Sequence, residues 1–409
     1  MKNKFLPTIG SLYVNYIFQG IATIIISQNM SLFQDRWHSS ISQITLVISA
    51  VGFGRILSIN LAGLLSDALG RRKAVILGAL SYVIFYLGLV FSPSYLLAFV
   101  FAIFAGIGNS FLDTATYPTV VEASESHQNN GALSVLNKSF ISMGQFLLPI
   151  ITSFLIKQHL FFGWTFLVSA GLLLVNCLFL ARLPFPAMSS GEKANSLPAS
   201  NSKEHVTVSA NGAKFAIEGI CLLVFSLVSV SLFNIFIIWV PTFADQIVGV
   251  SKTNSLMFVS LYSICSFTSV FLTSAIIKKG VNVVHFIITC TTLTALALIT
   301  MLVLPNMITL ILATVAIGFF AAGGIWQLGL VVLLEFFPNH RGRITSYYSL
   351  ATSLSVMAIP YLTGILAEKN IELVFVLLAA LAILGSLVQI IVSYRYNKVF
   401  HSSAAINNL

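Results

Sequence analysis

Twelve stretches of the chain are apolar over about 20 residues, the length that an α-helix needs to cross a bilayer. Membrane β-strands are about half as long and alternate strictly, so these stretches predict helices. The residues are 57% hydrophobic and only 8% charged, which excludes a soluble domain and a disordered chain. The sequence therefore predicts an all-α membrane protein with twelve transmembrane spans, at roughly 6–30, 41–66, 74–92, 95–121, 131–155, 162–181, 217–244, 253–277, 282–304, 307–334, 344–367 and 371–393.

The positive charges indicate how these spans are oriented. With the N-terminus inside the cell, fifteen Lys and Arg residues fall in inner segments and four fall in outer loops. Cytoplasmic loops carry such an excess, so both termini are predicted to lie inside. The same bias accounts for most of the net charge of +9, and we expect no nucleic acid among the partners. Two cations remain, Arg55 and Lys138, and both lie inside spans.

The chain is predicted to consist of two related halves. Its longest inner segment, 182–216, is rich in Ser, Asn, Ala, Pro and Lys, which is typical of a flexible linker. This linker separates six spans in 1–181 from six in 217–409. The spacing of a Gly and a Pro in the fifth span recurs 211 residues later, at Gly342 and Pro360, which favours duplication. Two facing six-helix bundles are typical of alternating access, with a substrate site between them near the bilayer midplane.

The segment that follows the second span carries the most specific motif. Its sequence, GLLSDALGRRK over 63–73, resembles the G-x-x-x-D-x-x-G-R-R/K signature loop of the major facilitator superfamily. Together with the spans, linker and repeat, the resemblance covers the whole chain. It implies the major facilitator fold and a secondary active transporter, with neither enzymatic activity nor a cofactor. It also implies a conformational latch at the inner end, which could alternatively be a simple positive-inside anchor. Its expected residues are Gly63, Asp67, Gly70, Arg71, Arg72 and Glu122.

Within that latch, each residue type has an expected role. Gly63 would let another helix approach closely, and Gly70 would permit the tight turn. Arg71 would reach the carboxylate of Glu122. Elsewhere, close glycines such as Gly52 with Gly54, and 323–324, are expected to be helix-packing positions.

Longer segments resemble a narrower group within the superfamily. Residues 28–30, 52–55, 109–118 and 321–338 are similar to poorly characterised inner-membrane permeases of enteric and related bacteria. That resemblance implies a multi-pass protein of the bacterial inner membrane and gives no substrate. The fourth span, with an acid at Asp113, also resembles proton-coupled fucose-type sugar permeases. The fifth span lacks the Gly-Pro pair of drug–proton antiporters, which makes drug efflux a less favoured alternative.

Three ionisable residues lie deep in the first half. At about 1.5 Å per residue, Arg55, Asp113 and Lys138 lie about 17, 14 and 12 Å from the inner ends of their spans. Each such charge costs about 2.5–3.5 kcal/mol to insert, so all three should face protein or water. One carboxylate cannot neutralise two cations. We therefore hypothesise that Asp113 pairs with Arg55 and carries the proton, while a substrate anion neutralises the remaining charge.

The expected substrate is a small organic anion or hydroxylated acid, bound with a proton by a monomer in the bilayer. Polar residues on the same helix faces would serve its hydroxyl groups. A neutral sugar symporter is the main alternative, and an ion-pair cluster that only holds helices together is the structural one. Lys138 could also extend its long stem toward the inner surface. The predicted substrate-binding residues are Lys138, Arg55, Asn15, Gln19, Asn109, Tyr117, Asn137, Gln145, Asn234 and Gln327.

Overall fold

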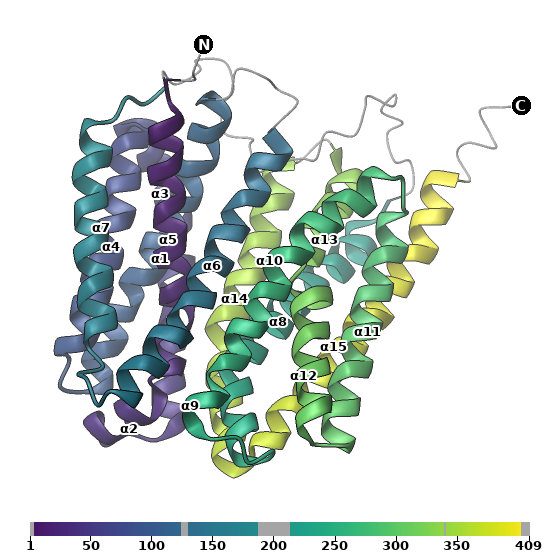
Figure 1. Cartoon of the computed structure of the whole chain (residues 1–409). Coiled ribbons are helices and arrows are strands. Elements are labelled where there is room, and N and C mark those ends of the chain that lie inside the picture. Colours follow the sequence, from purple (N-terminus) through teal and green to yellow (C-terminus); the bar gives the residue numbers. More distant parts are fainter. Residues whose placement is uncertain (1–3, 124–129, 187–212, 339–340, 402–409) are drawn as a thin grey trace, which may run out of the picture.

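The computed structural model describes residues 4–123, 130–186, 213–338 and 341–401. In this part of the chain all regular structure is helical, and twelve segments are long and apolar enough to cross a membrane, as predicted (Figure 1). The linker lies largely outside the described residues. The first half comprises α1 (Leu6–Gln28), α2 (Met30–Trp37), α3 (Ile41–Leu69), α4 (Arg71–Phe91), α5 (Tyr95–Ala123), α6 (Asn130–Lys157) and α7 (Trp164–Arg182).

The second half repeats six spans with more interruptions. Polar N-caps mark several helix starts; the side chain of Asn306, which precedes α12, accepts from two backbone N–H groups in the first turn of that helix. The elements are η2 (Phe215–Gly219), α8 (Ile220–Gln246), α9 (Lys252–Ser255), α10 (Met257–Lys278), α11 (Val283–Val303), α12 (Met307–Ala316), η3 (Ile317–Ala321), α13 (Ile325–Phe336), α14 (Arg341–Lys369), α15 (Ile371–Tyr396) and η5 (Asn397–His401).

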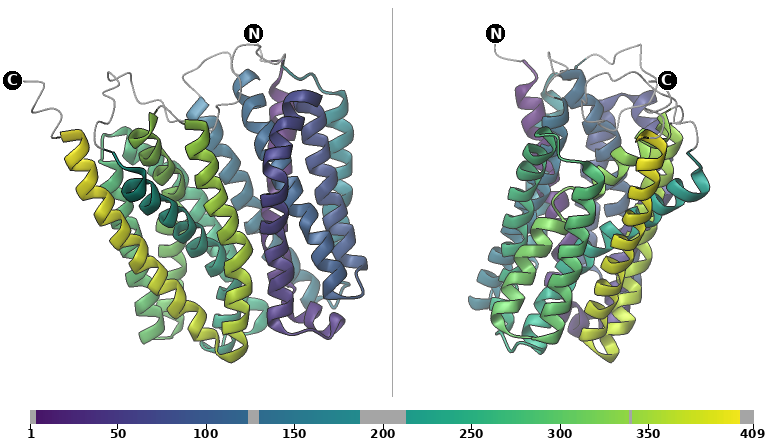
Figure 2. Two further views of the ribbon diagram at one scale, coloured as in Figure 1. Left: turned by 180° about the vertical axis from the view of Figure 1, so that it is seen from behind. Right: turned by 90° about the vertical axis from the view of Figure 1, so that its right-hand side faces the viewer.

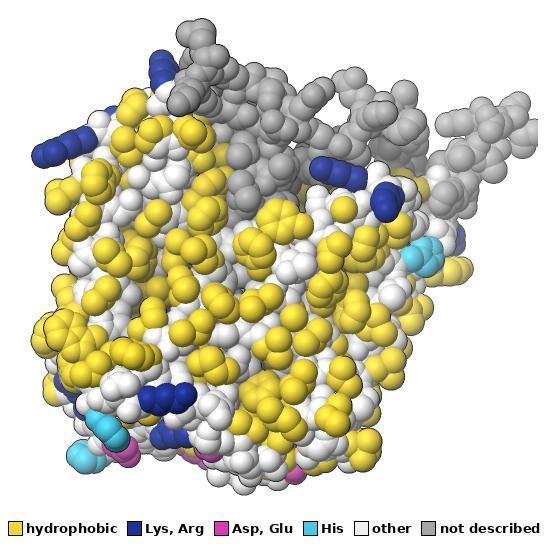
Figure 3. Space-filling view, viewed as in Figure 1, with side chains coloured by type: hydrophobic (Ala, Val, Ile, Leu, Met, Phe, Trp, Pro, Cys, Tyr) yellow, Lys and Arg dark blue, Asp and Glu magenta, His cyan; other side chains and the backbone are white. Residues whose placement is uncertain are grey.

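The same helix pairs pack together in both halves. In the first half α1 packs on α6 and α4 on α7; in the second, α8 packs on α14 and α11 on α15. The start of α1 and the end of α15 lie at one end of the molecule (Figure 2). We call this the inner end, following the predicted orientation. Hydrophobic side chains cover the middle of the face in Figure 3, and Lys and Arg lie toward its two ends.

The two halves meet along two seams, α3 against α14 and α6 against α10. At the outer end, the Ser42 backbone N–H donates to Glu368 over 2.8 Å, and the Tyr361 N–H donates to the Ser49 hydroxyl over 3.1 Å. Nearer the middle, the Ser260 hydroxyl donates to the Phe146 carbonyl over 2.9 Å. Five hydrogen bonds described between the halves all lie from mid-helix outward. The halves are therefore sealed together on the outer side.

Glycines make the α3–α14 seam possible. A Cβ atom added at Gly52 would collide with the backbone of Met357, and one added at Gly364 would collide with Thr45. Gly54 lies equally close to the backbone of Ile103 on α5. The expectation that Gly52 and Gly54 permit close helix packing thus agrees with their surroundings.

Three sequence-based expectations need correction. The first span ends at Gln28, and the chain turns into the separate short helix α2. The tenth span is not continuous: Gly324 has φ +103°, a left-handed conformation that favours glycine, so it separates η3 from α13 instead of serving helix packing. Finally, no neighbouring atom lies within 4 Å of a Cβ built on Gly63, so no helix approaches it in this conformation.

Candidate functional site

The centre of the first half contains an ion pair. Nη2 of Arg55 on α3 lies 3.3 Å from Oδ2 of Asp113 on α5, and the Tyr16 hydroxyl donates to Oδ1 over 3.4 Å. The close α3–α5 contact at Gly106, where a Cβ would collide with the backbone of Val51, brings the two charges together. The side chains of Arg55 and Asp113 remain 16% and 22% exposed, so the pair is not sealed in a dry core.

Amide and phenol side chains surround this pair. The Gln19 side-chain N–H donates to Asn109 Oδ1 over 2.8 Å, which joins α1 to α5. Tyr117 on α5 shares a side-chain hydrogen bond with Asn137 on α6. Gln145, two turns outward along α6, is buried, and its amide oxygen has no partner among the described residues. Most of the predicted polar residues of the first half are thus brought around one region.

Lys138 faces the opposite half. Its Nζ lies 4.7 Å from the ring centroid of Phe233 on α8, a cation–π contact. Among the described residues, no carboxylate lies within 4.0 Å of this ammonium. This contact places the Lys138 charge between the halves, without an anionic partner in the part of the chain that the structure describes.

A small cavity of about 40 Å³ lies between the halves at the same region. Val51 lines it, and Arg55 follows one turn further inward on α3. This volume holds a few water molecules, so a solute does not fit there while the outer side is sealed. The polar residues that line it are Thr23, Ser231, Asn234 and Ser355.

Two predicted binding residues have surroundings that differ from those of this region. Asn15 is fully buried, and its Oδ1 accepts from Asn176 of α7 over 2.8 Å, within the first half. Gln327, in the first turn of α13, is exposed. The spacing of Asn15 and Gln19 indicated a shared face, but the two side chains contact different helices.

Three of the six predicted latch residues, Asp67, Arg71 and Glu122, form a connected set of charges, and we use "inner latch" for these three from here on. Arg71 donates to Asp67 Oδ1 over 2.7 Å, and its Nε lies 3.6 Å from Glu122 Oε1. Burial raises the pKa of the Glu122 carboxyl, and the Arg71 guanidinium opposes that shift. Gly70, with φ +90°, forms the turn, and Arg72 donates to the Leu183 carbonyl over 2.8 Å.

Sequence reasoning missed two residues of the central region, Tyr16 and Phe233. Both are aromatic side chains in apolar spans, where such residues usually only pack. A signal for Tyr16 was available, because it precedes Gln19 by one helical turn. No comparable signal marks Phe233, because its contact depends on how the halves meet.

The fold is that of a membrane transporter with two six-helix halves around a polar centre. The chain matches the family model described as Major Facilitator Superfamily over residues 12–285 and 259–405. The chain belongs to this superfamily. It is therefore a multi-pass inner-membrane transporter of small molecules.

Curated relatives agree with this assignment, and solved structures share the fold. The chain is 33% identical over 398 residues to "Inner membrane transport protein YdiM" of Escherichia coli (strain K12), covering 97% of this chain and 96% of the relative. It is 32% identical to "Uncharacterized MFS-type transporter YfkL" of Bacillus subtilis (strain 168), covering 99% and 100%. Among solved structures, a D-xylose-proton symporter is 16% identical, with a TM-score of 0.71 and coverage of 93% and 96%. A bacterial homologue of the lysosomal transporter Spinster is 12% identical, with a TM-score of 0.73 and coverage of 97% and 98%.

Proposed function

We propose that this transporter moves a small organic anion or hydroxylated acid together with a proton. The observation that carries the proposal is the environment of Lys138, which contacts an aromatic ring and no carboxylate among the described residues. An unpaired charge at this depth is costly, and a substrate carboxylate would neutralise it. The neighbouring hydrogen-bonding groups of Asn137 and Tyr117 would receive the substrate hydroxyls.

Asp113 is the proposed proton carrier. It is the only acid in the polar centre among the described residues, and its partner Arg55 is held on another helix. Protonation would remove the attraction between them and free Arg55 to bind an anion or to move with α3. Loss of the proton would restore the pair, so that proton and substrate events are linked.

Alternating access would proceed by rocking the two halves about the polar centre. The outer seams carry the contacts between halves, while Gly63 at the inner end has open space beside it. In the opposite conformation, closure of the inner end would bring α14 toward Gly63, which is the close approach expected for this glycine. The inner latch would stabilise one of the two states. One chain contains both halves, and we propose that the monomer is sufficient.

Reconstituted proteoliposomes test the proposal directly. We expect an inward proton gradient to drive accumulation of a hydroxy acid such as gluconate or lactate, and not of a hexose or a lipophilic cation. Dissipating the gradient with a protonophore should abolish accumulation while exchange across the membrane continues. Accumulation that is indifferent to the proton gradient would contradict the coupling, and accumulation of the lipophilic cation alone would favour drug transport.

A neutral sugar symporter is the second candidate. The Gln19–Asn109 amide pair and the Tyr117–Asn137 pair favour it, because amides and phenols suit sugar hydroxyls. In that case Arg55–Asp113 would act as the proton switch without binding substrate. The hexose arm of the same experiment separates the two, since hexose accumulation with no acid transport would select the sugar.

A Gly52→Val variant is expected to disfavour the outer-sealed conformation, because the added side chain would collide with Met357 across the seam. In a cysteine-free background, a Ser42→Cys and Glu368→Cys pair joined by a short bifunctional maleimide reports closure of the outer end. We expect the cross-linking yield to fall several-fold in the Gly52→Val variant. Gly171→Val is the control, because nothing lies within 4 Å of its added Cβ. Equal yields in all three proteins would contradict the rocking model.

A further inference from the structure

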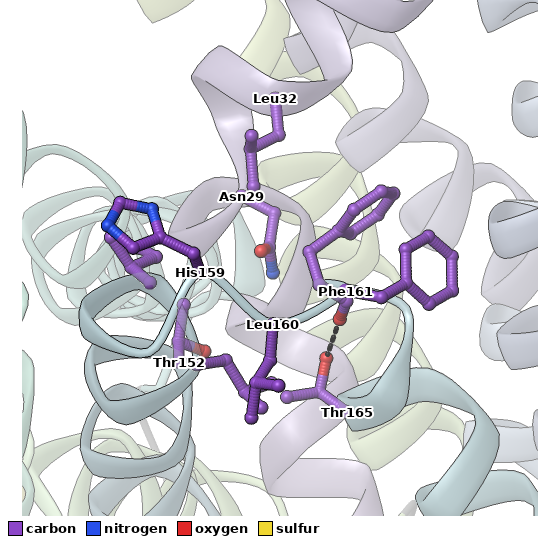
Figure 4. A pocket seen from close by; sticks show the side chains of 10 residues that line it. Asn29, Leu32, Thr152, His159, Leu160, Phe161 and Thr165 are labelled. Atoms are coloured by element: carbon purple, nitrogen blue, oxygen red, sulfur yellow. Dashed lines mark hydrogen bonds between the residues drawn. The ribbon is translucent and has the colours of Figure 1, made fainter.

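A second cavity lies at the outer end of the first half, away from the polar centre. It measures about 340 Å³, within the range of small-molecule sites in proteins. Its walls come from the α1–α2 junction, the end of α6, the segment between α6 and α7, and the start of α7. Figure 4 shows the side chains of Asn29, Thr152 and Leu160 converging on it from three of these segments.

The chemistry of the lining is mixed. Most of the lining is apolar, including Leu32, Leu155 and Phe162. Among the described residues that line the cavity there is no Asp, Glu, Lys or Arg, and the one His, His159, is exposed. A ligand that fills it should therefore be apolar over most of its surface and uncharged.

Buried polar groups without partners among the described residues lie in the lining of this cavity, at Thr152, and next to it, at Gln28, which directly precedes the lining residue Asn29. The Thr152 hydroxyl lines it, is 2% exposed as a residue, and has no hydrogen-bond partner among the described residues. Both amide atoms of Gln28, which is 5% exposed, are also without partners there. Gly144 of α6 lies against Ile21 of α1, and the two helices run in the same direction, so two turns further outward Gln28 comes level with Thr152.

The unpartnered Thr152 hydroxyl gives the cavity a polar group that a ligand can satisfy. Buried hydroxyls and amides are nearly always hydrogen-bonded, and leaving one unsatisfied costs about 1–3 kcal/mol. Thr165 also lines the cavity, but its hydroxyl donates a hydrogen bond to the Phe162 carbonyl over 3.0 Å. Within the described lining, the unpartnered buried hydroxyl is therefore that of Thr152 on α6.

We infer that this cavity binds a compact neutral molecule with an apolar body and one amide or hydroxyl end. The apolar body packs against Leu32, Leu155 and Phe162, and the polar end bonds Thr152 and Gln28. The site is built from the first half alone and lies on the outer side, so it is separate from the transport route. It adjoins the outer seam, because the Ser153 hydroxyl donates to the Thr253 carbonyl of the second half over 3.3 Å.

Fluorine NMR with 4-fluorobenzamide, added to the purified full-length protein, tests this site. We expect saturable broadening of the fluorine signal, and much weaker binding of the charged analogue 4-fluorobenzoate. A Thr152→Val variant should weaken binding about five-fold, the loss expected for one hydrogen bond. A Leu32→Trp variant should abolish binding by filling the cavity. Lys138→Met should leave binding unchanged, which separates this site from the central one.

Thermal unfolding shows whether weaker ligand binding by Thr152→Val results only from a less stable protein. Thr152→Val should keep or raise the melting temperature of the unliganded protein, because its hydroxyl has no partner to lose. The matched control is Thr314→Val, which removes a buried hydroxyl that donates to Leu310 over 2.7 Å and should lower the melting temperature. Equal binding of 4-fluorobenzamide by the wild type, Thr152→Val and Leu32→Trp would overturn the inference, as would preference for the benzoate.

Discussion

A Lys138→Met variant is expected to lose uptake of the acid substrate by at least about 30-fold while the protein becomes more stable. An anion paired with a buried cation contributes about 2 kcal/mol or more to binding, which is the source of the loss. The gain in stability arises because the ammonium has no carboxylate partner among the described residues, so its removal relieves a desolvation cost. Uptake into proteoliposomes and thermal unfolding measure the two effects.

Two further variants bracket this result. Lys138→Arg keeps the charge and should retain part of the uptake. Lys157→Met removes an exposed cation from the outer end of the same helix and should change neither property. Normal acid uptake by Lys138→Met would end the anion hypothesis, and a lower melting temperature would indicate that Lys138 has a structural role.

An Asp113→Asn variant is expected to abolish proton-driven accumulation and to destabilise the protein by up to about 3 kcal/mol. Removing one partner of a buried ion pair lowers the free energy of unfolding by about 3–5 kcal/mol. Because Arg55 and Asp113 are partly exposed, we expect a loss at the low end of that range. Adding Arg55→Met should recover most of the stability, since no unpaired charge remains in the pair. Coupling should not recover, because the proton carrier is still missing.

A double-mutant cycle on thermal unfolding measures the first effect, and uptake at pH 6 and pH 8 measures the second. Exchange of labelled for unlabelled substrate should persist in Asp113→Asn, since exchange needs no net proton movement. Accumulation that still follows the pH gradient in that variant would remove Asp113 from the proposed mechanism. If Asp113→Asn, Arg55→Met and the double variant all have the wild-type melting temperature, the pair has no structural role.

The fold was predictable because its main signals are local. Twelve apolar spans, the charge asymmetry and the motif at 63–73 require no knowledge of tertiary contacts. The break at Gly324 and the helix α2 were missed, since hydropathy does not distinguish a bend from a continuous span.

The site was only partly predictable. Depth along a helix follows from counting residues, and Arg55 and Asp113 could be placed at one level in this way. Which neighbour a side chain contacts depends on how the helices pair, and residue spacing along one helix does not give this. Asn15 was therefore expected to face the cavity, whereas it accepts a hydrogen bond from Asn176 of α7. Likewise Phe233 could not be assigned to Lys138, because the contact crosses from one half to the other.

The two ends of the molecule differ in what their contacts join. The outer seam joins the two halves through serine hydroxyls, backbone groups, glycine contacts and the Glu368 carboxylate, whereas the inner latch joins charged side chains within the first half. Because its three members come from three helices of the first half, the latch would tie the inner ends of α3, α4 and α5 into one block. We therefore expect the first half to move as a rigid unit when the inner end closes, with the bending confined to other helices.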